Sequence, residues 1–134
     1  MGIYDRDYYR HETADSLWIT GKAPATFVLI LVNVGVFLGQ SFGGWDIGGF
    51  DLTQLLALVP QEVFERLQFW RLLTATFCHA GISHLLFNML FLWWFGREIE
   101  KIYGSPEFLA YYLISAVFSS FVWGMVAWLR QLKA

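Results

Sequence analysis

The chain has 134 residues, of which 57% are hydrophobic and only 15% charged, and its formal net charge is −2. A soluble domain of this length buries too little surface to hide thirteen Phe, seven Trp and six Tyr, so the composition argues against an ordinary soluble domain. The sequence has no basic stripe, which argues against a nucleic-acid partner. We therefore expect an all-α integral membrane protein with about three transmembrane helices, in contact with membrane lipids.

The first predicted transmembrane helix follows a polar N-terminal tail. Residues 1–22 mix acidic and basic side chains and are expected to form a solvated tail. Residues 23–42 carry no charge and are long enough to cross the roughly 30 Å hydrocarbon core. This run is longer than the apolar part of a signal peptide and has no A-x-A-like cleavage site, so it should remain as an anchor. Residues 23–134 are thus predicted to form one membrane domain.

A charged but amphipathic segment separates the first two predicted spans. Residues 46–71 mix acidic and basic side chains with Leu, Val, Phe and Trp, which is typical of a structured loop in the membrane interface. A helical hairpin outside the membrane is the alternative interpretation. The second span is predicted at 83–103, with Gly81 interrupting the preceding helix and Ser83 as the N-cap.

The run Gly104-Ser105-Pro106 predicts a tight turn after the second span. Glycine suits the C-terminal end of a helix, serine an N-cap, and proline the first turn of the next helix. We expect an antiparallel pair of helices joined by two or three residues, with the third span at 106–129.

Positive charge is distributed only slightly unevenly across these predicted spans. The side that holds the N-terminal tail and the turn at 97–101 carries five Lys and Arg residues, and the opposite side carries four. Because cytoplasmic loops carry the excess of positive charge, we expect a multi-pass protein with its N-terminus in the cytoplasm.

Polar side chains at membrane depth concentrate at His79, His84 and Asn88, and such groups are costly there unless they are satisfied or functional. His84 and Asn88 are four residues apart, so both lie on one face of a helix. An imidazole and a carboxamide on one face can donate hydrogen bonds to a single small target. The oxyanion that develops during acyl transfer is such a target.

Two other interpretations of these residues stay open at this point. Polar side chains commonly hydrogen-bond between helices in membrane bundles without any catalytic role. A metal site would need more ligands than His79 and His84, which are separated by Gly81, and no Glu or Cys cluster supports them. We expect neither a metal nor another cofactor.

Several motifs follow one another between about residue 60 and Trp123. In chain order they are Trp70-Arg71, the H-x₄-H-x₃-N pattern of His79, His84 and Asn88, then Glu100, then Gly104-Ser105. Together they resemble the signature region of rhomboid intramembrane serine proteases. The number and order of these independent motifs make the resemblance specific.

The resemblance implies the first half of a six-helix core with a water-filled catalytic cavity. It implies that His84 and Asn88 are side-chain donors of the oxyanion hole, that His79 supports them, and that Trp70-Arg71 belongs to a loop in the outer leaflet. In the family, the nucleophile is a serine in a G-x-S-G motif on the fourth helix, and the base is a histidine on the sixth. The substrates implied are transmembrane proteins.

The chain departs from the family pattern because it contains no G-x-S-G motif. None of its seven serines resembles the nucleophile, and a serine without a positioned base is a weak nucleophile. We therefore expect the nucleophile and base to be absent from a truncated chain that is inactive alone. The function expected is intramembrane serine endopeptidase, with the C-terminal half supplied from elsewhere.

Two further hypotheses come from other functional classes. A non-catalytic rhomboid-like protein would bind transmembrane clients without cutting them, as a missing catalytic dyad predicts. A small structural bundle would associate through Gly35-x-x-x-Gly39 or through the face formed by Ala116, Ser120 and Gly124. We also expect this last face of the third helix to contact protein.

Overall fold

The computed structural model describes residues 23–42 and 51–133. Its elements are α1 (Pro24–Phe42), α2 (Leu52–Leu56), α3 (Pro60–Phe64), α4 (Arg71–Thr74), the 3₁₀ turn η3 (Ala75–Phe77), α5 (Ile82–Phe91), the π-helical segment η4 (Leu92–Gly96), α6 (Arg97–Tyr103) and α7 (Ser105–Gln131). The described residues contain no strand. The predicted tail at 1–22 and the start of the predicted interfacial loop, residues 46–50, lie outside the described residues.

Two of the helices are long and apolar enough to cross a membrane, namely α1 with 19 residues and α7 with 27. A third span arises if Arg71–Phe77 and Ile82–Tyr103, which are bent by 94° at the break between them, count as one. The predicted class, an all-α membrane protein, is therefore confirmed. Helix α7 is about 40 Å long at 1.5 Å per residue, which exceeds the hydrocarbon thickness and favours a tilted helix.

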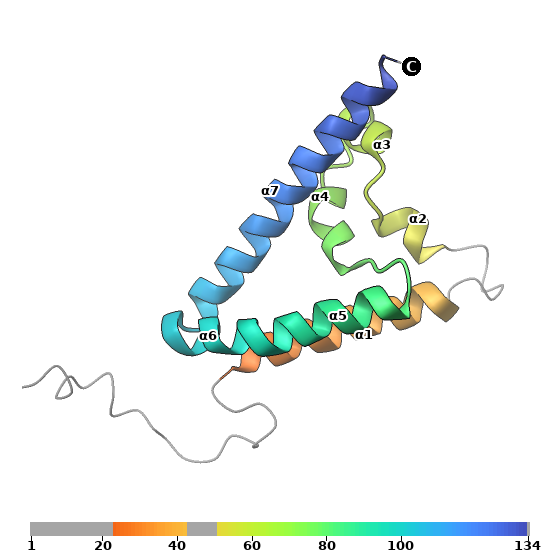
Figure 1. Cartoon of the computed structure of the whole chain (residues 1–134). Helices are drawn as coiled ribbons and strands as arrows, with labels where there is room; N and C mark the ends of the chain where they lie inside the picture. Colours follow the sequence, from red (N-terminus) through yellow and green to blue (C-terminus); the bar gives the residue numbers. More distant parts are fainter. Residues whose placement is uncertain (1–22, 43–50, 134) are drawn as a thin grey trace, which may run out of the picture.

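The helices form two arms that meet at the turn between α6 and α7 (Figure 1). One arm contains α1 and the continuous run of α5, η4 and α6, which lie side by side. The other arm is α7, and the short helices α3 and α4 pack against it. The core lies near the junction, where Ala25, Leu29 and Phe108 are buried together.

A single glycine joins the two arms. Gly104 lies between the last residue of α6 and the first residue of α7. Its φ is 93°, a backbone conformation that residues other than glycine rarely adopt. The predicted glycine position is confirmed, but the predicted connection of two or three residues is too long. Ser105 is not the N-cap either, because it is already the first helical residue and its hydroxyl donates to Glu100 instead.

The predicted cap at Ser83 is also wrong. Helix α5 begins one residue earlier, at Ile82, and Gly81 occupies the cap position without any side-chain hydrogen bond. Ser83 therefore lies in the first turn and is exposed. The backbone carbonyl of Gly81 accepts the first helical bond, from the N–H of Leu85 at 3.1 Å, so the helix starts without a side-chain cap.

Glu100 on α6 fixes the N-terminus of α1. Its side chain is 2% exposed and accepts hydrogen bonds from the backbone N–H groups of Ala25 and Thr26, each at 2.8 Å, and from the Thr26 hydroxyl at 2.7 Å. The Ser105 hydroxyl donates to the same carboxylate. A carboxylate at a helix N-terminus satisfies otherwise unpaired N–H groups and interacts favourably with the helix dipole. Glu100 thus ties α1, α6 and α7 together.

The small-residue face of α7 contacts protein, as expected from its spacing. Ala116 and Gly124 are buried. A methyl group added at Gly124 would lie 3.4 Å from the Phe64 ring and 3.7 Å from Leu58. The Gly124 end of this face is therefore occupied by α3 and the residues before it, which weakens the hypothesis that this end mediates association between copies.

Candidate functional site

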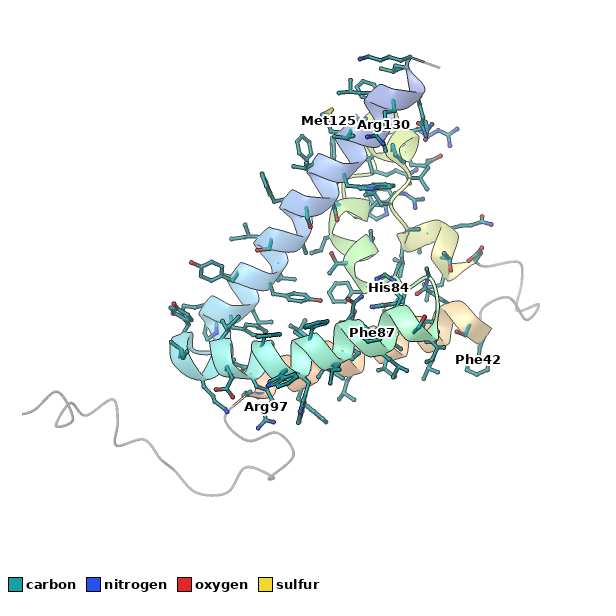
Figure 2. All side chains as sticks on the ribbon, in the orientation of Figure 1. Phe42, His84, Phe87, Arg97, Met125 and Arg130 are labelled. Carbon is teal, nitrogen blue, oxygen red and sulfur yellow. The ribbon has the colours of Figure 1, made fainter. Side chains whose placement is uncertain are left out.

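Helix α5 presents His84 and Asn88 on one face, one turn apart. Both side chains are exposed, whereas Leu85 between them is buried against the rest of the fold. Figure 2 shows His84 near the start of α5, with Phe87 a turn further along. The i, i+4 spacing and the exposure leave both side chains free to donate to one small group outside the described chain.

His79 lies in the segment that leads into α5 and is only 6% exposed. Its backbone N–H donates to Oε1 of Gln40 on α1 at 3.0 Å, and its ring Nδ1 lies 3.1 Å from the carbonyl oxygen of Phe77. Because a carbonyl oxygen only accepts, Nδ1 carries the proton in the neutral ring and Nε2 is an acceptor. His79 is therefore anchored at both backbone and ring.

The imidazole rings of His79 and His84 lie against each other. Their centroids are 5.2 Å apart, with an angle of 57° between the ring planes. The backbone N–H of Ala80 points to Nδ1 of His84 at 3.5 Å, a long hydrogen bond. An Nδ1 that accepts leaves Nε2 of the neutral ring protonated, and that nitrogen is then a donor. The contact with Ala80 favours the tautomer of His84 with the proton on Nε2, and the His79 ring packs against this imidazole.

Arg71 organises the loop before the site. It is 6% exposed, and its Nη1 donates to the carbonyl oxygens of Gln54 and Ala57 at 2.7 and 2.8 Å. Its Nε donates to Oε1 of Gln68 at 2.6 Å. The neighbouring Trp70 is 50% exposed. The guanidinium therefore links the C-terminal end of α2 with Gln68, and the Trp70 indole is half exposed.

A polar cavity of about 330 Å³ adjoins the Asn88 face of α5. Its lining residues are Asn33, Thr76, His79, Asn88, Met89, Leu92 and Tyr112. The sequence interpretation did not identify Asn33, Thr76 and Tyr112. The signal available was Asn33 itself, since a carboxamide in the middle of an uncharged apolar span is costly unless it has a partner.

The structure brings the three predicted residues together at the start of α5, and none of the serines that it describes is hydrogen-bonded to them. Among the described serines, Ser41, Ser105 and Ser119 donate to Phe37, Glu100 and Ala116, respectively. No serine hydroxyl of residues 23–42 and 51–133 hydrogen-bonds to a histidine ring. In the same part of the chain, no three His, Cys, Asp or Glu side chains converge as metal ligands do.

These observations define a helical membrane protein in which an exposed histidine and an asparagine share one face of a helix. A second, buried histidine lies in the segment just before that helix. A model of the rhomboid domain family matches residues 66–130, the part that contains all three residues. Rhomboid protease GluP of Bacillus subtilis (strain 168) is 32% identical over 113 residues, which cover 83% of this chain and 22% of that protein. Residues 66–130 of this chain are therefore similar to the rhomboid domain family.

The chain spans about a fifth of the length of this curated relative, since the matched residues cover 22% of it. No solved structure matches the chain significantly.

Proposed function

We propose that this chain contributes the oxyanion side of the catalytic site of an intramembrane serine endopeptidase. In this proposal, Nε2 of His84 and the carboxamide of Asn88 donate to the oxyanion of the tetrahedral intermediate, and His79 supports the His84 ring. Preorganised donors of this kind stabilise the charge that develops in the transition state. The serine nucleophile and its histidine base come from outside these 134 residues.

The observation that carries the proposal is the arrangement of these donors on α5. His84 and Asn88 are exposed on one face, while the His79 ring, 5.2 Å from the His84 ring, is buried and hydrogen-bonded to the Phe77 carbonyl oxygen, and the backbone N–H of His79 donates to Gln40. A pair of polar residues that only linked two described helices would be expected to bond across them. Instead, within residues 23–42 and 51–133, the one hydrogen bond to the His84 or Asn88 side chain is the contact between the Ala80 N–H and Nδ1 of His84.

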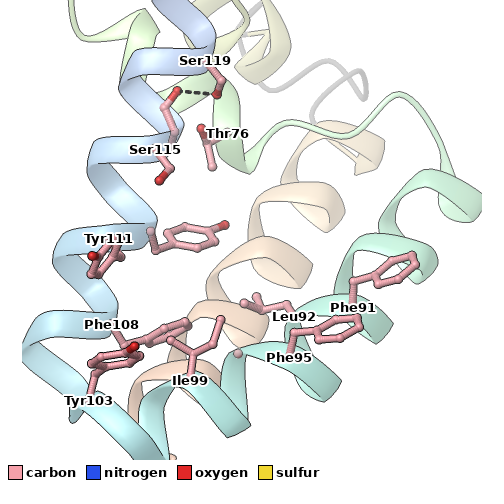
Figure 3. A pocket seen from close by; sticks show the side chains of 13 residues that line it. Thr76, Phe91, Leu92, Phe95, Ile99, Tyr103, Phe108, Tyr111, Ser115 and Ser119 are labelled. Carbon is pink, nitrogen blue, oxygen red and sulfur yellow. Dashed lines mark hydrogen bonds between the residues drawn. The ribbon is translucent and has the colours of Figure 1, made fainter.

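A large groove between the two arms supports a second part of the proposal, that further helices pack there. The groove has a volume of about 900 Å³ and lies between α7 and the run of α5 to α6 (Figure 3). Most of its lining is aromatic or aliphatic, including Phe95, Ile99 and Tyr111. We propose that helices of the C-terminal half of the catalytic core, in the same or a separate polypeptide, fill this groove and bring the nucleophile to His84 and Asn88.

The orientation and substrates belong to the same proposal. A slight excess of Lys and Arg on the side of the N-terminal tail, five against four, supports a cytoplasmic N-terminus. The apolar helices that are long enough to cross a membrane and the similarity to the rhomboid domain family support transmembrane proteins as substrates.

Experiments on the purified 134-residue protein test whether this chain supplies the oxyanion donors while the nucleophile and base come from elsewhere. Alone, it should neither cleave a transmembrane substrate nor react with a serine-directed fluorophosphonate. A C-terminal fragment with the G-x-S-G serine and the distal histidine should restore both cleavage and labelling when it is placed in the same membrane. Labelling of any serine in the isolated chain would contradict the proposal. A chain that binds substrates but stays inactive with the fragment would favour a client-binding function instead.

A further inference from the structure

Arg97 is the first charged side chain after a long uncharged stretch of the chain. Residues 72–96 contain no Asp, Glu, Lys or Arg. The neighbouring Gly96 packs against the first turn of α1, since a methyl group added there would lie 3.2 Å from the Thr26 hydroxyl. The uncharged stretch therefore ends at the level where α1 begins. This level is the edge of the hydrocarbon core, where the phosphate groups of phospholipids lie.

The indole of Trp93 covers one face of the Arg97 guanidinium. The guanidinium carbon lies 4.4 Å from the ring centroid, which is a cation–π contact. Among the described residues, Nε of Arg97 is buried without a hydrogen-bond partner. The side chain as a whole is partly exposed, and Figure 2 shows it near the start of α6, on the side away from α7. The described chain thus orients the guanidinium plane but supplies no acceptor for Nε.

The other charged side chains of α6 are paired with different partners. Lys101, one turn further along, donates to Glu98 at 2.7 Å. The Glu100 carboxylate accepts its hydrogen bonds from the start of α1 and from α7. Within residues 23–42 and 51–133, no carboxylate forms an ion pair with Arg97. This part of the chain therefore leaves the positive charge of Arg97 uncompensated.

We propose that Arg97 and Trp93 form a binding site for the phosphate group of an anionic phospholipid. The planar donors of a guanidinium match two phosphate oxygens, and the Trp93 ring holds the plane in one orientation. One phosphodiester group carries a single negative charge, which balances the charge of Arg97. A zwitterionic headgroup also brings an ammonium group, whereas the adjacent Glu98 is already paired with Lys101. The site is independent of the proposed catalytic function.

Native mass spectrometry of the full chain tests this site. The protein is released from micelles that contain equal amounts of phosphatidylglycerol and phosphatidylethanolamine, and we expect it to retain more phosphatidylglycerol. Arg97→Gln should lower the retained phosphatidylglycerol by about tenfold, because a charge-assisted bond to the phosphate is lost. Arg97→Lys keeps the charge but loses the planar pair of donors, so its retention should fall between that of the wild type and that of Arg97→Gln.

Arg130 provides the matched control. It also follows a long uncharged stretch, residues 108–129, and it is exposed in the last turn of α7. In the part of the chain that the structure describes, the cation–π contact is made by Arg97 and not by Arg130. Arg130→Gln should therefore leave the preference for phosphatidylglycerol unchanged. Trp93→Leu keeps the charge of Arg97 but removes the ring, and it should weaken the preference.

An excess of inorganic phosphate distinguishes a lipid headgroup from a free anion. We expect it not to displace phosphatidylglycerol, and displacement would show that the site binds phosphate without the lipid. Equal retention of the two lipids by the wild-type protein would overturn the proposal. So would an equal loss of phosphatidylglycerol in Arg97→Gln and Arg130→Gln, because any interfacial charge would then suffice. The wild-type comparison holds even if a variant fails to fold.

Discussion

Glu100 illustrates how one buried charge can hold three helices. Its carboxylate accepts two backbone bonds from α1 and two hydroxyl bonds, from Thr26 and Ser105, while the side chain is 2% exposed. A buried carboxylate is tolerated when its hydrogen bonds are satisfied in this way. The residue was recognisable in the sequence only as part of the family motif. Its partners on α1, Ala25 and Thr26, are 75 and 74 residues away, so no local pattern could reveal them.

We expect Glu100→Ala to lower the free energy of unfolding by on the order of 3 kcal/mol, since it leaves the N–H groups at the start of α1 unsatisfied. Glu98→Ala, two residues earlier in α6, is the matched control. Glu98 is exposed and, among the residues that the structure describes, is bonded only to Lys101, so its loss should leave stability unchanged. Unfolding by sodium dodecyl sulfate in mixed micelles measures the free energy of unfolding of both variants. Equal effects of the two substitutions would show that Glu100 does not anchor α1.

At the scale of the elements, the contact of α1 with the α5 to α6 run depends on a close approach at Gly96. A methyl group added there would lie 3.1 Å from Leu92, 3.2 Å from the Phe108 ring and 3.2 Å from the Thr26 hydroxyl. Gly96 is the last residue of the π-helical segment, whose wide turns shift the register of the helix faces that follow. This segment places Gly96 and Glu100 opposite the start of α1.

Gly96→Ala should therefore destabilise the protein by about 1–3 kcal/mol, because Thr26 and Phe108 must move to accommodate the methyl group. Gly35→Ala is the control, since it makes the same change in α1 at a position with no atom within 4 Å. Alanine has the higher helix propensity, so the control should be neutral or slightly stabilising. Thermal unfolding in one detergent compares the two variants. A Gly96→Ala protein as stable as the control would mean that the helices are not this close.

The helix ends show what sequence reasoning can and cannot predict at this scale. Gly104 was predictable because only the backbone conformation of the turn matters, and glycine signals it. The predicted caps at Ser83 and Ser105 failed because both helices begin earlier than local capping preference indicates. The Ser105 hydroxyl donates to Glu100, and α5 starts at Ile82 without any side-chain cap.

The order of the helices also fixes a topology for the whole molecule. Because Gly104 alone connects α6 and α7, residues just before and just after it must lie on the same side of the membrane. Single cysteines at Arg97 and Glu107, in a chain whose Cys78 is replaced by serine, should react with a membrane-impermeant thiol reagent from one side only. Reaction of the two sites from opposite sides would contradict the helix assignment.

The candidate site was predictable in part. His79, His84 and Asn88 are close in sequence, and a motif within one helix and the segment before it keeps its geometry in the fold. Asn33, Thr76 and Tyr112 were missed because α1, η3 and α7 converge on the polar cavity only in three dimensions. The partners of Arg71 were missed for the same reason. They are backbone carbonyl oxygens, which every residue has, so the residue types do not identify them.

The central claim is that His84 and Asn88 donate to an oxyanion, and turnover of the enzyme reconstituted with the C-terminal fragment tests it most directly. His84→Ala or Asn88→Ala should lower kcat by about 10²- to 10³-fold with little change in KM, because the donors act mainly in the transition state. Phe87→Ala, which alters an exposed neighbour on α5, should keep its turnover. Unchanged kcat in folded His84→Ala and Asn88→Ala proteins would contradict the claim and leave both residues as polar contacts between helices.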